Sequence, residues 1–142
     1  MLKKLSDILR NPNQSDVTRA QAAIQLKNAI YSKDETIKQQ HQERWLQMTE
    51  DVRAYIKNNC IETLGTETKR PSQAAQCVGY IACAELPRGL WPDCINRLML
   101  NVTAQNATEM LKESSLEAIG YICQDIVSTY FNNIFYLFLI FI

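Results

Sequence analysis

A repeated tripeptide constrains the fold of this 142-residue chain more than any other feature of its sequence. Gly-Tyr-Ile occurs at residues 79–81 and again at residues 120–122, each time inside a stretch with the apolar spacing of an amphipathic helix. The copies lie 41 residues apart, within the period of roughly 40–47 residues found in repeats of paired antiparallel helices. Because each such unit buries its apolar face only against its neighbours, the interval predicts an α-solenoid.

A weaker third copy of the repeat precedes these two. Residues 23–26 can be aligned with residues 77–80 and 118–121, so that all three segments lie on the second helix of a pair. The first interval is 54 residues long, 13 more than the second. This excess matches the length of a polar helix expected around residues 41–45. The sequence therefore predicts an all-α solenoid of about three antiparallel helix pairs plus one inserted helix.

Turn and capping residues divide the chain into helices, and no stretch shows the strict alternation of a half-buried strand. Ser15 or Asp16 is suited to cap one helix, Ser72 is suited to cap another, and Gly65 is suited to end one. The helices expected from these signals span residues 2–10, 16 to about 31, 35–45, 50–64, 73–84, 91–102 and 108 to about 125.

Apolar spacing also predicts which side chains face the core. Ile24 and Tyr55 fall on the apolar stripes of their helices, and the two tryptophans are expected to pack between neighbouring repeats rather than to anchor a partner peptide. A glycine inside a helix costs about 1 kcal/mol relative to alanine. Gly79 and Gly120 therefore each predict the close approach of a neighbouring helix.

Charge and cysteine content exclude several classes of protein. Fifteen Lys and Arg residues balance fifteen Asp and Glu residues, so the basic excess that accompanies nucleic-acid binding is absent. The five cysteines are odd in number and lie mostly within apolar helical patterns. This favours reduced, buried thiols in a cytosolic or nuclear protein over a disulfide framework. The first five residues lack the following apolar region of a secretory signal peptide.

No arrangement of residue types predicts catalysis, a metal site or a cofactor. The sequence has no Gly-rich phosphate loop and no nucleophile motif, and its single histidine, His41, lies in a polar helix. Cys77 and Cys83 share one helix, but their spacing places them about 120° apart around it, and no cysteine spacing matches a zinc motif. We therefore expect a protein that is not an enzyme and that holds no metal or cofactor.

Seven segments of the chain share their sequences with one known family. They are Leu-Lys-Asn at 26–28, Gln-Glu-Arg-Trp-Leu at 42–46, Thr-Leu-Gly-Thr-Glu-Thr at 63–68, Gln-Cys-Val at 76–78, Ile-Ala-Cys-Ala-Glu at 81–85, Trp-Pro at 91–92 and a run at 112–126 that contains Glu-Ala-Ile-Gly-Tyr-Ile-Cys-Gln-Asp-Ile. Together they closely resemble the amino-terminal region of importin β, the karyopherin family built from HEAT repeats. The resemblance covers about residues 6–126, and its longest run is too varied to arise from composition.

This resemblance implies HEAT-like helix pairs and a nuclear transport receptor for protein import, present in the cytoplasm, in the nucleus and at the pores of the nuclear envelope. Family members bind cargo directly or through the adaptor importin α, contact the Phe-Gly repeats of nucleoporins, and release cargo when Ran-GTP binds. The amino-terminal repeats form part of the Ran-GTP surface. Because the main sites for importin α and nucleoporins lie beyond the region matched, Ran-GTP is the partner that the resemblance implies for this chain.

The family pattern divides the chain into residues 1–126, which follow it, and residues 127–142, a hydrophobic tail outside it. Family members carry another helix pair before the equivalent of Leu2, so we expect the chain to lack both ends of the full receptor. The last nine residues of the tail are all apolar. A membrane anchor is not favoured, because a span needs roughly 18–20 apolar residues. Two alternatives are a cover for the exposed end of the solenoid and a non-family end from a truncated or alternative transcript, and we favour the latter.

Polar residues on the expected second helices are the candidates for contact with Ran. Second helices line the concave face of such solenoids, where the resemblance places Ran. The candidates on the first of them and the turn that follows are Lys27, Asn28 and Lys33, and those on the later ones are Gln73, Gln76, Glu109, Lys112 and Glu113. The alternative for each residue is an ordinary solvated side chain.

The function that these observations predict is a receptor fragment with part of the Ran-GTP surface. The alternative is an inert or competing structural scaffold fragment without transport activity. Binding to Ran in its GTP state but not in its GDP state discriminates between the two.

Overall fold

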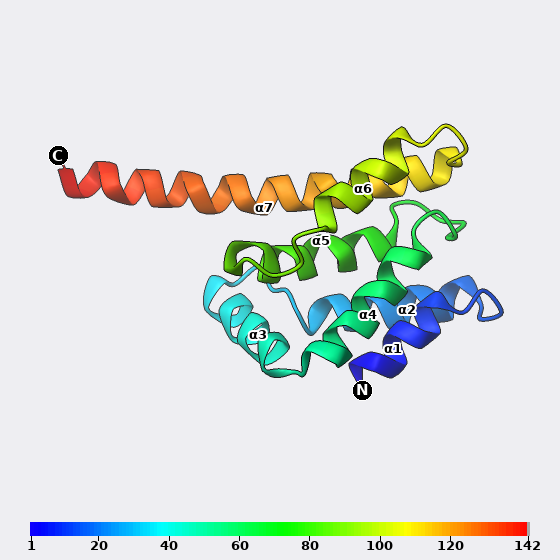
Figure 1. Ribbon diagram of the computed structural model, residues 1–142. Coiled ribbons are helices and arrows are strands. Elements are labelled where there is room, and N and C mark those ends of the chain that lie inside the picture. The colour runs from blue at the N-terminus through cyan, green and yellow to red at the C-terminus, as the bar shows by residue number, and fades with distance from the viewer. Residues whose placement is uncertain (142) are drawn as a thin grey trace.

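The computed structural model (Figure 1) describes the backbone of residues 1–141 and the side chains of residues 1–128 and of Leu139. Over that range all regular secondary structure is helical, as predicted. The elements are α1 (Leu2–Arg10), α2 (Asp16–Asn28), α3 (Glu35–Gln47), α4 (Glu50–Thr63), α5 (Gln73–Glu85), the short 3-10 helix η1 (Leu86–Arg88), α6 (Cys94–Thr103) and α7 (Glu109–Phe141).

The helices pack as three pairs, with one helix inserted between the first pair and the second. α1 packs on α2, α4 packs on α5 and α6 packs on α7, while α5 also lies against both α2 and α7. We call α2, α5 and α7 the second-helix layer. In the other layer α1 packs against α4, and the inserted helix α3 contacts α5. This arrangement confirms the predicted three pairs plus one inserted helix.

Contacts between second helices follow the predicted repeat intervals. The Cys77 thiol on α5 donates a hydrogen bond to the Ala23 carbonyl on α2 at 3.4 Å. On the other side of α5, a Cβ added at Gly79 would lie only 2.6 Å from the Cβ of Tyr121 on α7, so the predicted close approach is confirmed there. The same prediction is wrong at Gly120, which is exposed and where an added Cβ would meet nothing within 4 Å.

Local sequence sets most of the helix ends. The Ser15 hydroxyl accepts a hydrogen bond from the backbone N–H of Thr18 at 3.1 Å, and the Ser72 hydroxyl accepts one from Ala75 at 3.0 Å. Both serines therefore cap helices as predicted. Gly65 has a φ of 78°, in the left-handed region that suits the glycine after a helix.

Three predicted boundaries are wrong. α2 ends at Asn28 rather than near residue 31. α6 begins at Cys94 rather than at residues 91–92, because Trp91 has a φ of 56° and turns the chain before the helix starts. α7 continues to Phe141 rather than ending near Asp125, since residues 121–141 contain no glycine or proline that would interrupt it.

Burial corrects two of the predicted core positions. Ile24 is 41% exposed and Tyr55 is 39% exposed. The Tyr55 hydroxyl donates to the carboxylate of Asp7 instead. On α2 the buried Arg19 faces inward, and its Nε donates to the Leu9 carbonyl at 2.8 Å, an interaction that apolar spacing cannot indicate. The two tryptophans are buried, as predicted.

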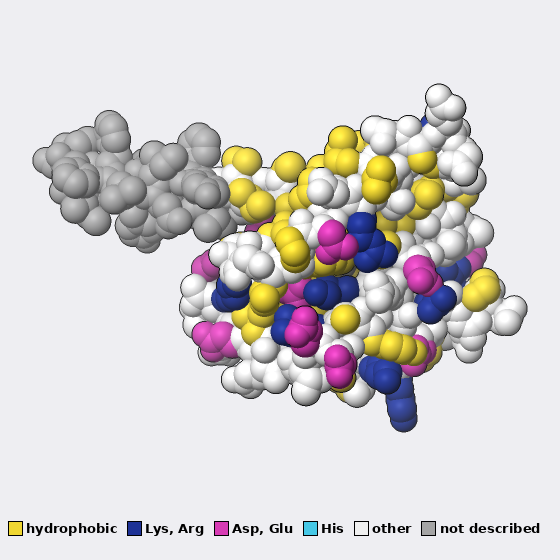
Figure 2. All heavy atoms as spheres, viewed as in Figure 1, with side chains coloured by type: hydrophobic (Ala, Val, Ile, Leu, Met, Phe, Trp, Pro, Cys, Tyr) yellow, Lys and Arg dark blue, Asp and Glu magenta, His cyan; other side chains and the backbone are white. Residues whose placement is uncertain are grey.

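Apolar side chains are most exposed on α6 and on the nearby part of α7. Figure 2 shows hydrophobic side chains gathered over these helices, whereas Lys, Arg, Asp and Glu are interspersed over the rest of this face. Met99 is 44% exposed and Leu116 is 52% exposed, while Cys94 and Leu98 face inward. Within the described part of the chain, no helix combines the length and the apolar character that crossing a bilayer requires.

Candidate protein-binding surface

Three of the eight candidate residues lie together at one end of the second-helix layer. Lys27 and Asn28 are in the last turn of α2, and Lys33 lies in the loop before α3. A shallow depression of about 450 Å³ joins them, and we call its lining the basic depression: Lys27, Asn28, Tyr31, Ser32, Lys33 and His41. No carboxylate of the described residues forms an ion pair with either lysine. Their charges therefore face solvent without internal compensation.

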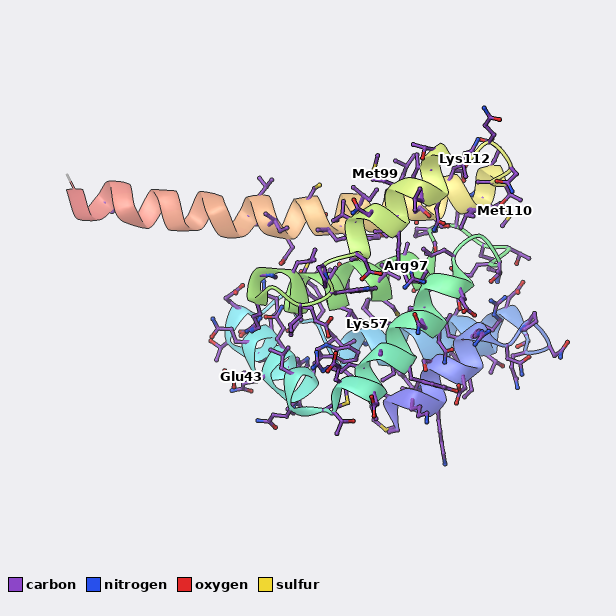
Figure 3. The ribbon with its side chains drawn as sticks, in the orientation of Figure 1. Glu43, Lys57, Arg97, Met99, Met110 and Lys112 are labelled. Carbon is purple, nitrogen blue, oxygen red and sulfur yellow. The ribbon has the colours of Figure 1, made fainter. Side chains whose placement is uncertain are left out.

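The other charged candidates lie at the opposite end of the layer, in the first turns of α7. Lys112 pairs with Glu109 at 3.4 Å, and Glu113 pairs with Arg70 at 2.6 Å. Figure 3 shows Lys112 far from Glu43 of α3, and α3 is the helix that contributes His41 to the basic depression. These three candidates therefore do not share a site with Lys27, and their charges are partly neutralised within the chain.

The two glutamine candidates lie on α5. Gln73, in the first turn of α5, lines a small hollow with Asp16 and Arg19. Gln76 lies one turn further on, and its Nε2 donates to the hydroxyl of Tyr121 at 3.3 Å. The structure thus places the eight candidates in separate groups: three line the basic depression, three lie in the first turns of α7 and two lie on α5. Contact of any of them with Ran stays a prediction.

Three tyrosines form a column across the layer, and we call Tyr31, Tyr80 and Tyr121 the tyrosine ladder. The rings of Tyr31 and Tyr80 are stacked with centroids 3.9 Å apart, and those of Tyr80 and Tyr121 are tilted with centroids 5.7 Å apart. Burial, with smaller effects from the neighbouring tyrosines, raises the pKa of Tyr80 to about 12. Sequence reasoning missed this column, although the 41-residue interval already placed Tyr80 and Tyr121 at equivalent positions.

An ion pair beside the ladder ties α3 to α7. The Nζ of Lys38 lies 3.2 Å from Oδ1 of Asp125 and 3.1 Å from Oε2 of Glu35. Burial acts to lower the pKa of Lys38, but the hydrogen bonds to Glu35 and Asp125 outweigh it and raise that pKa above its ordinary value. Lys38 therefore stays charged and holds the inserted helix next to the third pair.

Glu85, at the end of α5, is a second anchor for α3 and was not a predicted site. Its side chain is fully buried. It accepts hydrogen bonds from Trp45 Nε1 at 3.1 Å, from Arg53 at 2.7 Å and from Lys57 at 2.6 Å. A buried carboxylate with charged donors on two sides is compensated within the fold. Glu85 therefore connects α3, α4 and α5 and is unavailable to a partner.

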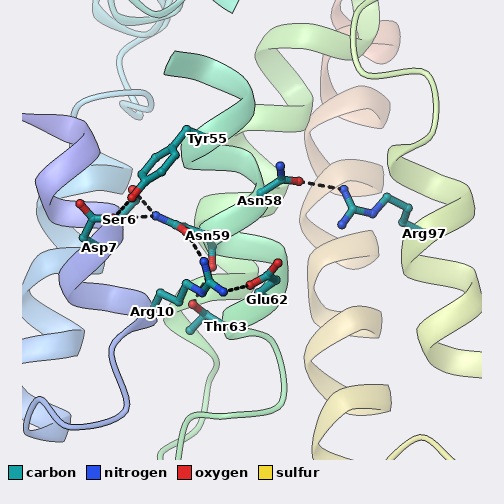
Figure 4. A network of polar contacts seen from close by, with 9 residues as sticks. All are labelled: Ser6, Asp7, Arg10, Tyr55, Asn58, Asn59, Glu62, Thr63 and Arg97. Carbon is teal, nitrogen blue, oxygen red and sulfur yellow. Dashed lines mark hydrogen bonds and ion pairs between the residues drawn. The ribbon is translucent and has the colours of Figure 1, made fainter. Parts of the chain in front are cut away.

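A polar network in the other layer is likewise satisfied internally (Figure 4). Asn59 of α4 donates to the Ser6 hydroxyl at 3.0 Å and to the Asp7 carboxylate at 3.1 Å on α1. Its carbonyl oxygen accepts from Arg10 at 3.2 Å, and Arg10 also pairs with Glu62. These contacts fix α1 against α4, so we assign the network a structural role.

The cysteines do not form a reactive or metal-binding cluster among the described residues. Cys60, Cys77, Cys83 and Cys94 are buried. Desolvation raises the pKa of Cys83, with Asp125 adding to the effect, and raises the pKa of Cys94 to about 12. The thiols of Cys83 and Cys94 are therefore protonated near neutral pH and are poor nucleophiles. No group of three metal-ligating side chains is found in the described part of the chain.

Comparison with known proteins points to one family. The family described as the Importin-beta N-terminal domain matches residues 1–66. Importin subunit beta-1 of Schizosaccharomyces pombe is 35% identical over 123 residues, which cover 86% of this chain and 14% of that protein. Importin subunit beta-1 of Saccharomyces cerevisiae is 36% identical over 121 residues, with 84% and 14% covered. The chain thus spans about one seventh of the length of these relatives.

Solved structures show the same similarity in three dimensions. A structure of yeast importin-beta, Kap95p, superposes with a TM-score of 0.78 at 33% identity, over 92% of this chain and 16% of that one. In a second structure, with a TM-score of 0.78 and 34% identity over 86% and 14% of the two chains, Kap95p binding induces the switch loops of RanGDP to adopt the GTP-bound conformation. A third is a Kap95:Nup1 complex, with a TM-score of 0.77 at 33% identity over 92% and 16% of the two chains.

Proposed function

The chain belongs to the importin β family, and from that premise we propose that it carries part of the surface with which a nuclear transport receptor binds Ran in its GTP state. The observation that carries the proposal is the basic depression, which Lys27 and Lys33 both line without a carboxylate partner among the described residues. Such charges are available to the acidic or carbonyl groups of another protein.

Among the eight candidate residues we favour the three that line the basic depression. Glu113 is paired with Arg70, and Lys112 is paired with Glu109, so a partner would have to compete with contacts already made. Lys27, Asn28 and Lys33 have no such competition from a charged neighbour. We therefore place the main polar contact at the basic depression and give the α7 residues a lesser role.

The similarity to Kap95p supports this choice of partner. Binding of Kap95p makes the switch loops of RanGDP adopt the GTP-bound conformation. A surface that favours this conformation should bind Ran-GTP more tightly than RanGDP, because part of the binding energy for RanGDP must drive the change. We expect the same order of affinities for this chain.

The wider role that we propose is protein import between cytoplasm and nucleus, with nucleoporin contact as in the Kap95:Nup1 complex. The energy of a solenoid interface is spread over many repeats. A chain that matches 14% of its relatives' length should therefore bind Ran more weakly than they do, and could compete for Ran without transporting cargo.

Titration of the full chain against Ran tests the proposal, with Ran loaded either with a non-hydrolysable GTP analogue or with GDP. We expect tighter binding of the GTP form and roughly tenfold weaker binding after Lys27→Glu, equivalent to about 1.4 kcal/mol. Lys4→Glu, on an exposed lysine of α1, is the matched control and should change affinity little. If a folded helical sample binds neither form, the chain is a scaffold without this activity.

A further inference from the structure

Ser32 occupies the wall of the basic depression and lies outside any helix. α2 ends at Asn28 and α3 begins at Glu35, so Ser32 belongs to a short loop between them. Its hydroxyl accepts a hydrogen bond from the backbone N–H of Asp34 at 3.2 Å. The side chain is half-buried. A modifying enzyme can therefore reach Ser32 in a loop, and reading Glu35 as well engages only the first turn of α3.

The residues after Ser32 favour one class of modifying enzyme. Asp34 and Glu35 stand two and three positions after the serine, and both are exposed. Protein kinases select substrates partly by charge pattern. Acidic residues two and three positions after a serine suit an acidophilic kinase, whose substrate cleft is basic, although the residue directly after this serine is Lys33. The exposed carboxylates of Asp34 and Glu35 are the local features that such an enzyme reads.

A phosphate on Ser32 would meet positive charge in the same depression. Phosphoserine carries a charge of about −1.5 to −2 at pH 7 and three strong acceptor oxygens. Lys27 and Lys33 line the depression with Ser32, and neither is paired with a carboxylate among the described residues. The Nδ1 of His41, also in this lining, is buried and has no hydrogen-bond partner.

Acidic groups near Ser32 oppose the phosphate but are already engaged. The neighbouring hollow, which shares Tyr31, Ser32 and Lys33 with the basic depression, is lined also by Glu35, Lys38, Tyr80, Tyr121, Gln124, Asp125 and Ser128. Glu35 and Asp125 both contact Lys38. The side chain of Asp34 accepts the N–H of Ile37 at the start of α3. Lys27 and Lys33, which form no ion pair with the described residues, are thus the charges that can pair with a phosphate on Ser32.

We propose that Ser32 is a phosphorylation site for an acidophilic serine kinase and that Lys27 and Lys33 hold its phosphate in the basic depression. The γ-phosphorus of ATP forms a bond to Oγ of Ser32 while its bond to the β–γ bridging oxygen breaks. ADP leaves with that electron pair, and the hydroxyl proton passes to the base of the kinase.

The modification would regulate the surface proposed above, and this part of the inference rests on the proposed function. A phosphate that pairs with Lys27 and Lys33 occupies the charges offered to Ran, and it repels acidic groups of an approaching partner. Phosphorylation should therefore weaken Ran-GTP binding by more than Lys27→Glu alone.

The first experiment treats the folded full chain with ATP and casein kinase 2, and locates phosphate by mass spectrometry. We expect phosphate on Ser32, none at this site in Ser32→Ala, and slower modification of Glu35→Gln. Asp34→Asn, which keeps a side chain able to cap α3, should slow it too. Absence of phosphate from Ser32 in the folded chain overturns the proposal.

The second experiment follows the phosphate itself by ³¹P NMR titration. We expect the midpoint of the second ionisation to be about 0.5 pH unit lower in the phosphorylated chain than in its Lys27→Gln/Lys33→Gln variant, because the lysines favour the dianion. The matched double variant Lys4→Gln/Lys69→Gln changes two exposed lysines elsewhere and should leave the midpoint where it is. Equal midpoints in all three proteins overturn the assignment.

Ran binding then separates the two proposals. If the phosphate titration responds to the two lysines but neither form of the chain binds Ran, the phosphate site stands and the proposed function fails. If the unmodified chain binds Ran-GTP and phosphorylation at Ser32 leaves that affinity unchanged, the proposed function stands and the regulatory inference fails.

Discussion

The two copies of Gly-Tyr-Ile have the same residues on equivalent helices but different surroundings. Around Gly79, α5 is covered by α2 on one side and by α7 on the other, and the glycine is buried. Around Gly120, the described part of the chain covers α7 from the side of α5 and α6, and the glycine is exposed. The glycine of the first copy packs against a neighbouring helix, whereas the glycine of the second copy is exposed to solvent. Position in the layer decides which.

The same contrast holds for the tyrosine of each copy and for the acidic residue a few positions after it. Tyr80 stands in the middle of the tyrosine ladder with an aromatic ring on each side, whereas Tyr121 contacts one ring of the ladder. α5 ends in the buried Glu85, whose three donors come from the chain itself. The corresponding end of this packed part of α7 carries Asp125, which joins the Lys38 pair near the surface.

We expect the largest loss in free energy of unfolding when the buried carboxylate at the end of α5 is removed. Glu85→Ala leaves Arg53 and Lys57 without their carboxylate, and we expect it to lower the free energy of unfolding by about 3–5 kcal/mol. Urea denaturation followed by helical circular dichroism measures this. Glu62→Ala removes a half-exposed partner of Arg10 and should cost about 1 kcal/mol or less. Similar losses for the two variants would contradict the assignment of Glu85 as an anchor.

Substitution of each glycine by alanine tests directly whether the two copies have different surroundings. At Gly79 the new Cβ would clash with the Cβ of Tyr121, and we expect a net loss of about 1–3 kcal/mol. At Gly120 the Cβ meets open space, so Gly120→Ala should stabilise the protein by about 0.5–1 kcal/mol through helix propensity. Thermal and urea denaturation of both variants under the same conditions measure whether each substitution lowers or raises the free energy of unfolding. Changes of equal sign would mean that the two copies are equivalent after all.

The smallest effect concerns the pH dependence of stability. The pKa of Tyr80 is raised to about 12 by burial, against about 10 in an unfolded chain. Between these values the folded protein keeps a proton that the unfolded chain has lost, so stability falls as pH rises from about 10 to 12. Tyr80→Phe lacks this titration, and its free energy of unfolding should fall less steeply between about pH 10 and pH 12. A slope identical to that of the wild type would show that Tyr80 contributes nothing to it.

Much of the fold was predictable because it depends on local signals. The repeat intervals gave three pairs and an inserted helix, and the hydroxyls of Ser15 and Ser72 marked helix starts that the structure confirms. Predictions failed where a local signal was overruled or absent. Trp91 has a left-handed backbone conformation, which is uncommon for a residue other than glycine and which no local sequence signal predicts. α7 continues past Asp125 because no glycine or proline follows to end the helix.

The candidate site was predictable only in part. Lys27, Asn28 and Lys33 are close in sequence and remain close in space. Gln73, Gln76, Glu109, Lys112 and Glu113 were grouped with them by helix order, but position along each helix separates them. The partners that neutralise Glu113 and bury Glu85 come from other helices, so no pattern within one helix could reveal them.

By itself the sequence determined the helical class, the repeat period and most helix starts, because backbone hydrogen bonding, apolar spacing and capping act over a few residues. The tertiary structure alone decided which glycine is buried, which carboxylate is surrounded by donors and which lysines remain unpaired. Those properties depend on how closely separate helices approach one another, since contact, desolvation and charge compensation are set by distances between elements rather than by residues within one.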